Sequence, residues 1–244
     1  MMLACRMQTL GTMFVMLGQY CNLSYHKPER LTPMITLHHL NNSRSQRILW
    51  LLEELGVDYD VVTYQRDATT NLAPPELKAV HPLGKSPVIT DGELTIHETG
   101  AIVEYLLLTY GDGRFVPAAD SPDYIKYLEW MHYAEGSAML PLLLRLYTGR
   151  LGDVVAPIMP RIDGETENHF SYMNDHMTGR EYFVGDQLTG ADFMMSFPLE
   201  AAKLRGLLTP YTALLTFVDR VQGQPAYLRG LERGGAYSFG PVVT

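Results

Sequence analysis

The stretch 34–64, MITLHHLNNSRSQRILWLLEELGVDYDVVTY, decides the fold of this chain. Residues 34–40 alternate apolar with polar side chains, and residues 59–64 are β-branched and aromatic, so both segments predict strands. Between them, residues 45–56 carry apolar side chains at helical spacing and end in Gly56, a residue suited to a helix C-terminus. This order predicts two parallel strands joined by a crossover helix.

A hairpin and a second long helix follow this unit. Residues 86–90 and 93–96 are candidate strands on either side of an Asp-Gly pair, which is a hairpin signal. Residues 99–110 are apolar on nearly every face, which predicts a deeply buried helix. We therefore expect an α/β domain over residues 34–112.

The second half of the chain has a different character. Residues 111–122, GDGRFVPAADSP, are rich in Gly, Pro and Asp, and we assign residues 113–121 to a linker. Amphipathic patterns beyond it predict an all-helical domain over residues 122–244. The predicted helices include residues 123–147, 154–177 and 191–204.

The start of the helix predicted over residues 191–204 is well marked. Thr189 and Asp192 form a T-x-x-D capping box. Leu188 and Phe193 stand where a hydrophobic staple closes over such a box. We interpret these residues as structural and not as catalytic.

Composition and charge limit the function. The chain has 19 basic and 27 acidic residues, a net charge of −8, and its basic residues form no block, which argues against nucleic acid as a partner. Cys5 and Cys21 both precede the α/β domain, and the histidines lack partners at ligand spacing, so we expect no metal site. We expect residues 1–33 to be a flexible extension, and their apolar run 7–17 is too short to span a membrane.

Asn42 and Ser43 lie in the turn between the first predicted strand and helix. Backbone N–H groups at a helix N-terminus favour anions, and a serine hydroxyl or an asparagine amide can donate a further hydrogen bond to one. The alternative is that Asn42 or Ser43 merely caps the helix.

Ser86 and Pro87 open the third predicted strand. A cis proline here would leave the preceding backbone N–H and C=O at an exposed edge where an extended peptide can pair. Lys85 could then meet a carboxylate. The alternative is a trans proline that opens an edge strand beside a solvated Lys85.

Glu98 and Thr99 stand at the start of the buried helix predicted over residues 99–110. Glu98 can bind an ammonium group, while the Thr99 hydroxyl and backbone N–H can receive a carboxylate. The pair would suit the zwitterionic end of an amino acid. The alternative is that Thr99 is an ordinary N-cap and Glu98 complements the helix dipole.

Taken together, these segments and the helical second half resemble the glutathione transferases. The resemblance covers about residues 34–235 and is closest to the bacterial and fungal members with serine or asparagine at the active turn. It implies a thioredoxin-like N-terminal domain and an all-α C-terminal domain. The motifs that carry it are NNSRSQR (41–47), HPLGKSPVITDG (81–92), HETGAIVEYL (97–106) and TGADF (189–193).

The resemblance also implies residue roles. Counting back from Arg47, which closes the family's first-helix motif, leads to Asn42 with Ser43 beside it, and we favour Ser43 as the thiolate donor with Asn42 second. Arg44 follows Ser43 where proline is commoner. Backbone pairing at Ser86 and binding of the γ-glutamyl end by Glu98 and Thr99 are implied. The predicted glutathione contacts are Arg44, Lys85, Ser86, Pro87, Glu98 and Thr99.

The implied activity is that of a cytoplasmic, homodimeric detoxification enzyme with glutathione as co-substrate and no metal. Its glutathione thiolate would attack an apolar electrophile or reduce a peroxide. Tyr133, Met139 and Tyr147 on the long predicted helix would line the electrophile pocket, or else belong to the core. The alternative function is a non-catalytic glutathione-transferase-like binding or regulatory protein.

Overall fold

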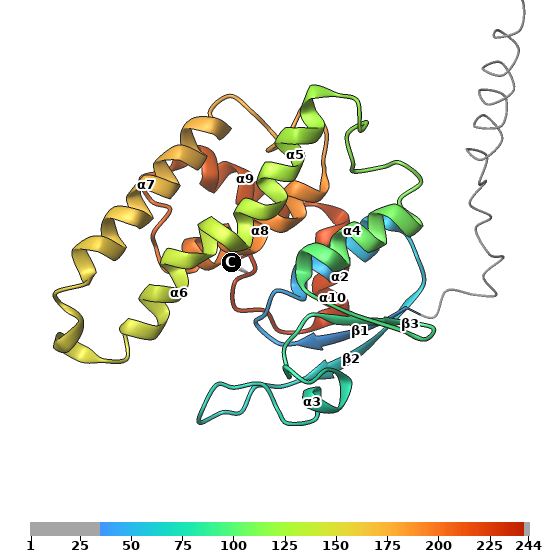
Figure 1. Ribbon diagram of the computed structural model, residues 1–244, viewed down its shortest axis with the longest axis horizontal. Helices are drawn as coiled ribbons and strands as arrows, with labels where there is room; N and C mark the ends of the chain where they lie inside the picture. The colour runs from blue at the N-terminus through green and yellow to red at the C-terminus, as the bar shows by residue number, and fades with distance from the viewer. Residues whose placement is uncertain (1–34, 242–244) are drawn as a thin grey trace, which may run out of the picture. The chain divides into compact units, whose positions relative to one another are not determined.

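The computed structural model describes residues 35–241, which all belong to one unit of the chain, Pro33–Thr244 (Figure 1). The extension predicted over residues 1–33 lies outside the described residues. Within the described part, no helix combines the length and the apolar character needed to cross a bilayer.

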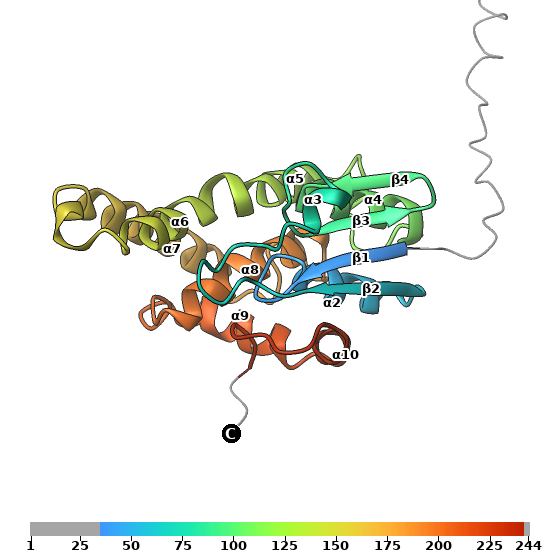
Figure 2. The same ribbon diagram turned by 90° about the horizontal axis from the view of Figure 1, so that it is seen from below.

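A four-stranded sheet forms the first half of the described chain (Figure 2). β1 pairs parallel with β2, whereas β3 pairs antiparallel with both β1 and β4, and the order across the sheet is β2-β1-β3-β4. The predicted parallel pair and the predicted hairpin are both confirmed. The strands are β1 (Ile35–Leu40), β2 (Tyr59–Tyr64), β3 (Val88–Asp91) and β4 (Leu94–His97).

Three helices accompany the sheet: α2 (Gln46–Leu55), α3 (Leu77–Val80) and α4 (Thr99–Tyr110). α2 connects β1 to β2 and packs against α4, α8 and α10, which buries it on nearly every side. It ends where Gly56 adopts a left-handed conformation with φ of 68°, which glycine reaches without a steric penalty.

The second half is helical, as predicted. Its long helices lie beside one another, with α6 and α7 forming a hairpin at one end (Figure 1). The elements are α5 (Pro122–Tyr133), η1 (Ala134–Ala138), α6 (Met139–Thr148), η2 (Gly152–Val155), α7 (Met159–Met177), α8 (Gly190–Leu204), α9 (Thr212–Gln222) and α10 (Pro225–Gly234).

Two of the predicted helices differ from the structure. The helix predicted over residues 123–147 is divided into α5 and α6 by η1, a π-helical turn, because a single widened turn hardly disturbs the apolar periodicity on which the prediction rests. The helix predicted from residue 154 begins at Met159. Pro160 fits the first helical turn but would remove a hydrogen bond in a helix interior.

α8 lies within the core of the helical half, and every residue from 190 to 202 along it is buried. Thr189 and Asp192 form the predicted capping box at its start. The Asp192 carboxylate accepts hydrogen bonds from the backbone N–H groups of Phe183 (2.9 Å) and Thr189 (2.8 Å) and from the Thr189 hydroxyl (3.0 Å). All of these groups are buried, so the capping box stabilises the fold from inside the helical half.

Candidate active site

One end of the sheet brings together the three segments that the sequence indicates. β1 leads into the turn of residues 41–45, and near its end His38 pairs with Val88 at the start of β3. Val88 in turn pairs with His97 at the end of β4. Three segments therefore lie at the same end of neighbouring strands: the turn of residues 41–45, the segment before β3 and the start of α4.

Ser43 belongs to a chain of buried hydrogen bonds. Its hydroxyl oxygen lies 2.8 Å from that of Ser45, which lies 2.8 Å from Nδ1 of His39. Ser43 also accepts a hydrogen bond from the Ser45 backbone N–H at 3.2 Å and is only 5% exposed. Burial lowers the pKa of His39 to about 4, so its imidazole is neutral at neutral pH. The Ser43 hydroxyl is thus engaged inside the fold.

Asn42 has a different environment. It adopts φ of 51°, in the left-handed region that asparagine tolerates. Its Oδ1 accepts a hydrogen bond from the Ser238 backbone N–H at 2.7 Å, and its main-chain oxygen accepts one from Arg66 at 3.2 Å. Its side-chain NH₂ group has no hydrogen-bond partner among residues 35–241 and is not a fully buried atom. This amide donor is therefore open.

The two arginines of the first motif converge on Glu135. The Arg44 Nε donates to both carboxylate oxygens of Glu135, at 2.9 and 2.8 Å. Arg47 is buried and donates to Glu135 and to the Met194 carbonyl. Burial alone would raise the pKa of Glu135, but the positive charges of Arg47 and Arg44 outweigh it and lower that pKa. These ion pairs connect η1 to the turn of residues 41–45 and to the start of α2.

The peptide bond between Ser86 and Pro87 is cis, the first of the two alternatives that the sequence left open. The Ser86 hydroxyl donates to the His38 carbonyl at 2.8 Å and accepts from the Leu40 N–H at 3.1 Å, which ties this segment to β1. The backbone N–H and C=O of Ser86 have no hydrogen-bond partner within the described residues. Lys85 is exposed.

α4 begins beside this segment. Glu98 is its N-cap residue, with φ of 67°, and no side-chain hydrogen bond caps the helix. The interpretation of Thr99 as an ordinary N-cap is therefore wrong, because Thr99 is already the first helical residue. Glu98 is exposed, whereas Thr99 is 5% exposed.

The three residues predicted to line an electrophile pocket lie in different surroundings. The Tyr133 hydroxyl is 2.6 Å from Nδ1 of His169 on α7. Met139 is 4% exposed and belongs to the core, so it presents little surface to a ligand. Tyr147 is 62% exposed near the end of α6.

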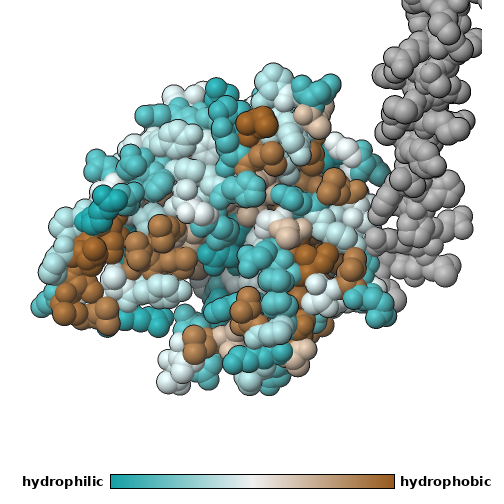
Figure 3. All heavy atoms as spheres, viewed as in Figure 1, coloured by the Kyte–Doolittle hydropathy of each residue, from teal (hydrophilic) through white to brown (hydrophobic). Residues whose placement is uncertain are grey.

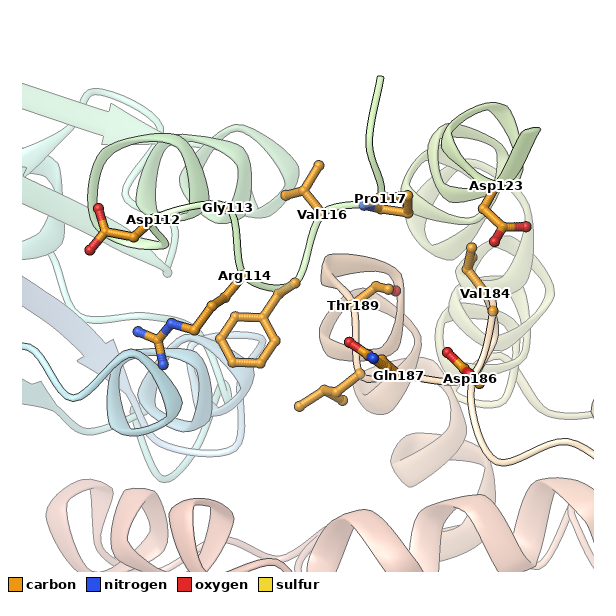
Figure 4. Close-up of a pocket in the computed structure, with 13 residues that line it drawn as sticks. Asp112, Gly113, Arg114, Val116, Pro117, Asp123, Val184, Asp186, Gln187 and Thr189 are labelled. Atoms are coloured by element: carbon orange, nitrogen blue, oxygen red, sulfur yellow. The ribbon is translucent and has the colours of Figure 1, made fainter. Parts of the chain in front are cut away.

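A cavity of about 550 Å³ lies between residues 112–117 and residues 184–189 (Figure 4). Arg114, in the wall formed by residues 112–117, donates to the carbonyls of Glu54 and Leu55 at 3.2 and 2.9 Å. These two carbonyls at the end of α2 lack partners within the helix, so Arg114 supplies their hydrogen bonds. None of the predicted site residues lines this cavity.

Several residues around the active turn carry no sequence signal that would identify them. Glu135 lies inside a predicted helix without a motif, and Ser238 follows the last predicted helix. Arg66 holds the turn through the main-chain oxygens of Asn41 (3.1 Å) and Asn42 (3.2 Å). Across residues 35–241, no group of His, Cys, Asp or Glu side chains is arranged to hold a metal ion.

Comparisons with known proteins agree with this fold. The family models of the glutathione S-transferase N-terminal and C-terminal domains match residues 32–107 and 161–228. Glutathione S-transferase 3 of Schizosaccharomyces pombe is 37% identical over 209 residues, which are 79% of this chain and 85% of the relative. Glutathione S-transferase 1 of Saccharomyces cerevisiae is 32% identical over 229 residues, 84% and 97% of the two chains.

A solved structure gives the same result. The crystal structure of a glutathione S-transferase from Actinobacillus pleuropneumoniae superimposes with a TM-score of 0.78 at 36% identity, covering 84% of this chain and 94% of that chain. The fold is a thioredoxin-like N-terminal domain joined to a helical C-terminal domain, as predicted. The chain belongs to the glutathione transferase family.

Proposed function

We propose that this protein binds glutathione and holds its sulfur as a thiolate, which attacks an apolar electrophile or reduces a peroxide. The observation that carries the proposal is the turn before α2, where the Asn42 amide NH₂ group has no partner among residues 35–241. The names of the two yeast relatives and of the bacterial structure support glutathione as the co-substrate.

Glutathione would lie along the end of the sheet, with its cysteinyl part paired to the free backbone groups of Ser86 before Pro87. The exposed Glu98 carboxylate and the Thr99 N–H would receive the ammonium and carboxylate of the γ-glutamyl end. Lys85 would meet the glycine carboxylate. Arg44 uses its Nε for Glu135, which leaves its terminal nitrogens for the ligand.

The turn can supply the energy that this chemistry needs. A thiol with a pKa of about 8.5 is only a few per cent ionised at neutral pH, and lowering that pKa by about two requires about 2.7 kcal/mol of preferential thiolate binding. One hydrogen bond to an anion contributes about 1.5–3 kcal/mol, and the helix N-terminus adds about 0.3–1 kcal/mol. The hydrogen bond and the helix N-terminus together can supply this free energy without a general base.

The electrophile would bind beside the sulfur, between the sheet and the helices that Glu135 fastens to the active turn. Tyr133 directly precedes η1, and we propose that it and Tyr147 form the apolar wall of the electrophile pocket. The buried Met139 would support this wall from the core. Which electrophile is bound depends on these surfaces and not on the glutathione contacts.

We also propose a cytoplasmic homodimer. Figure 3 shows apolar surface at the end of the α6 and α7 hairpin, and a surface of this kind is stabilised by burial against a partner. The large exposed apolar residues of α6 and the segment after it are Leu140, Leu144, Leu146, Tyr147, Leu151, Val154 and Ile158.

The proposed function is tested by binding and turnover. We expect the protein to be retained on immobilised glutathione and to conjugate glutathione to a generic aromatic halide. Replacing both candidate donors, Ser43→Ala with Asn42→Ala, should lower kcat at least about tenfold with little change in glutathione affinity, because one lost bond to an anion is worth that much.

Asn168→Ala is the matched control, since Asn168 is exposed on α7. The single variants Ser43→Ala and Asn42→Ala identify the donor. The single variant that lowers kcat as much as the double variant removes the side chain that hydrogen-bonds to the sulfur. A wild-type protein that neither binds immobilised glutathione nor turns over the halide would instead support the non-catalytic binding protein.

A further inference from the structure

The segment of residues 237–239, which follows α10, is anchored on both sides of Ser238. The Tyr237 hydroxyl donates to Glu200 Oε2 at 2.6 Å, and the Phe239 carbonyl accepts from Gln222 Nε2 at 2.8 Å. The Phe239 ring lies 5.6 Å from that of Phe197 on α8. Contacts with both α8 and α9 therefore fix the position of the Ser238 backbone.

Ser238 directs its backbone N–H at the active turn. This N–H lies 2.7 Å from Oδ1 of Asn42. The two ends of an asparagine amide are told apart by their partners, and a backbone N–H can only donate. The oxygen of the Asn42 amide must therefore face Ser238, and its NH₂ group must face away.

The rest of Asn42 is held from another direction. Arg66 donates to its main-chain oxygen at 3.2 Å, so the backbone of Asn42 is fixed as well as its side chain. In contrast, the Ser43 hydroxyl already has a hydrogen-bond partner in Ser45 at 2.8 Å. Of the two candidate donors, only the NH₂ group of Asn42 is free within residues 35–241.

We propose that Ser238 is a positioning residue: its backbone N–H holds the Asn42 amide so that the NH₂ group is presented to the sulfur of glutathione. This inference rests on the proposed function and deepens it, since it assigns the thiolate donor to Asn42. It also gives the C-terminal segment a role in the chemistry, although no residue of it needs to touch the substrate.

The test removes one backbone donor. Ser238→Pro lacks the N–H, whereas Ser238→Ala keeps it and is the matched control. In the full-length protein with bound glutathione, the ultraviolet absorbance of the thiolate gives the pKa of the bound thiol. We expect Ser238→Pro to raise this pKa by about 0.5–1 and to lower kcat/KM about three- to tenfold, because the loss of one hydrogen bond lets the amide rotate. Ser238→Ala should match the wild type.

A second background separates positioning from a general structural effect. In Asn42→Ala, the change Ser238→Pro should leave the pKa of the bound thiol where Asn42→Ala alone puts it. An equal rise in both backgrounds, or no difference between Ser238→Pro and Ser238→Ala, would overturn the proposal.

Two further outcomes are interpretable. If Ser238→Pro does not fold, Tyr237→Phe replaces it in the test, because this change removes the hydrogen bond from the Tyr237 hydroxyl to Glu200. We expect Tyr237→Phe to lower kcat/KM about twofold in the wild-type background and to have no effect in Asn42→Ala. The same twofold loss in Asn42→Ala would refute the positioning role. If wild-type protein binds glutathione without lowering the pKa of its thiol, the proposed function fails before the positioning role is reached.

Discussion

Helices α2 and α8 both begin with short polar side chains, yet the residues around their N-termini are used differently. At α8, the fully buried Asp192 accepts three hydrogen bonds from Thr189 and Phe183, and the capping box is complete. At α2, the N-cap residue Ser45 makes no side-chain cap bond, and the Asn42 amide NH₂ group has no partner among residues 35–241.

The difference shows how a helix start is adapted to stability or to a ligand. The first backbone N–H groups of any helix lack intrahelical partners. At α8 the capping box satisfies such groups, and at α2 Ser43 does so, because its hydroxyl and carbonyl accept from the N–H groups of Ser45 and Gln46. The two starts differ in the turn before the helix, where Asn42 offers its free amide donor to the proposed thiolate.

The largest effect is expected at the capping box of α8. Asp192→Ala should reduce the free energy of unfolding by about 3–4 kcal/mol, because it leaves three buried donors without an acceptor. Urea unfolding measures the loss. The folded fraction of this variant should retain the glutathione affinity of the wild type.

The control for this change is Asp186→Ala, in the same region of the chain but exposed. Its effect should stay within about 0.5 kcal/mol. A similar loss for both substitutions would mean that α8 does not depend on its capping box, and the contrast with α2 would have no energetic basis.

A smaller effect is expected from pH, which should act on the two helix starts in opposite directions. Burial lowers the pKa of His39, beside α2, from 6.5 to about 4, and burial raises that of Asp192 from 3.8 to about 6. The stability that neutral His39 contributes is therefore present above pH 6.5 and lost as the pH falls through 4. For Asp192, the part of its contribution that depends on protonation is present below pH 3.8 and lost as the pH rises through 6.

His39→Gln isolates the first of these effects. The wild type should exceed the variant in unfolding free energy at pH 7, and this gap should narrow by about 2–3 kcal/mol on going to pH 4, because only the wild type must protonate a buried imidazole. Urea unfolding at several pH values measures the gap. A gap that is constant with pH would show that His39 is not held neutral in the folded protein.

Much of the fold could be predicted from the sequence, because its signals are local. Period-two and β-branched patterns predicted β1 and β2 within one residue, and Gly56 marked the end of α2. The π-helical turn η1 was missed, since one widened turn leaves the apolar pattern nearly intact. The domain limits at residues 112 and 122 stay predictions.

The site was only half predictable, for a physical reason. Its motif residues lie at helix starts and before Pro87, where short sequences indicate the local geometry. The groups that hold them come from far along the chain, as the separation of 91 residues between Arg44 and Glu135 and of 196 between Asn42 and Ser238 shows. Tertiary packing, which no local pattern records, makes these contacts.

The smallest effect is expected from the apolar packing just before each of the two helices. Leu188, just before the capping box, packs half-buried against the core that contains Phe193, whereas the residue before Ser45 at α2 is the charged Arg44. Leu188→Ala should therefore cost about 1 kcal/mol of unfolding free energy, since it removes part of one apolar side chain from a partly buried site. Leu72→Ala, at a leucine that is 62% exposed, is the matched control and should change stability by less than about 0.5 kcal/mol. Equal effects at the two leucines would show that α8 is held by its polar cap alone, so that the two helix starts differ in hydrogen bonding but not in apolar packing.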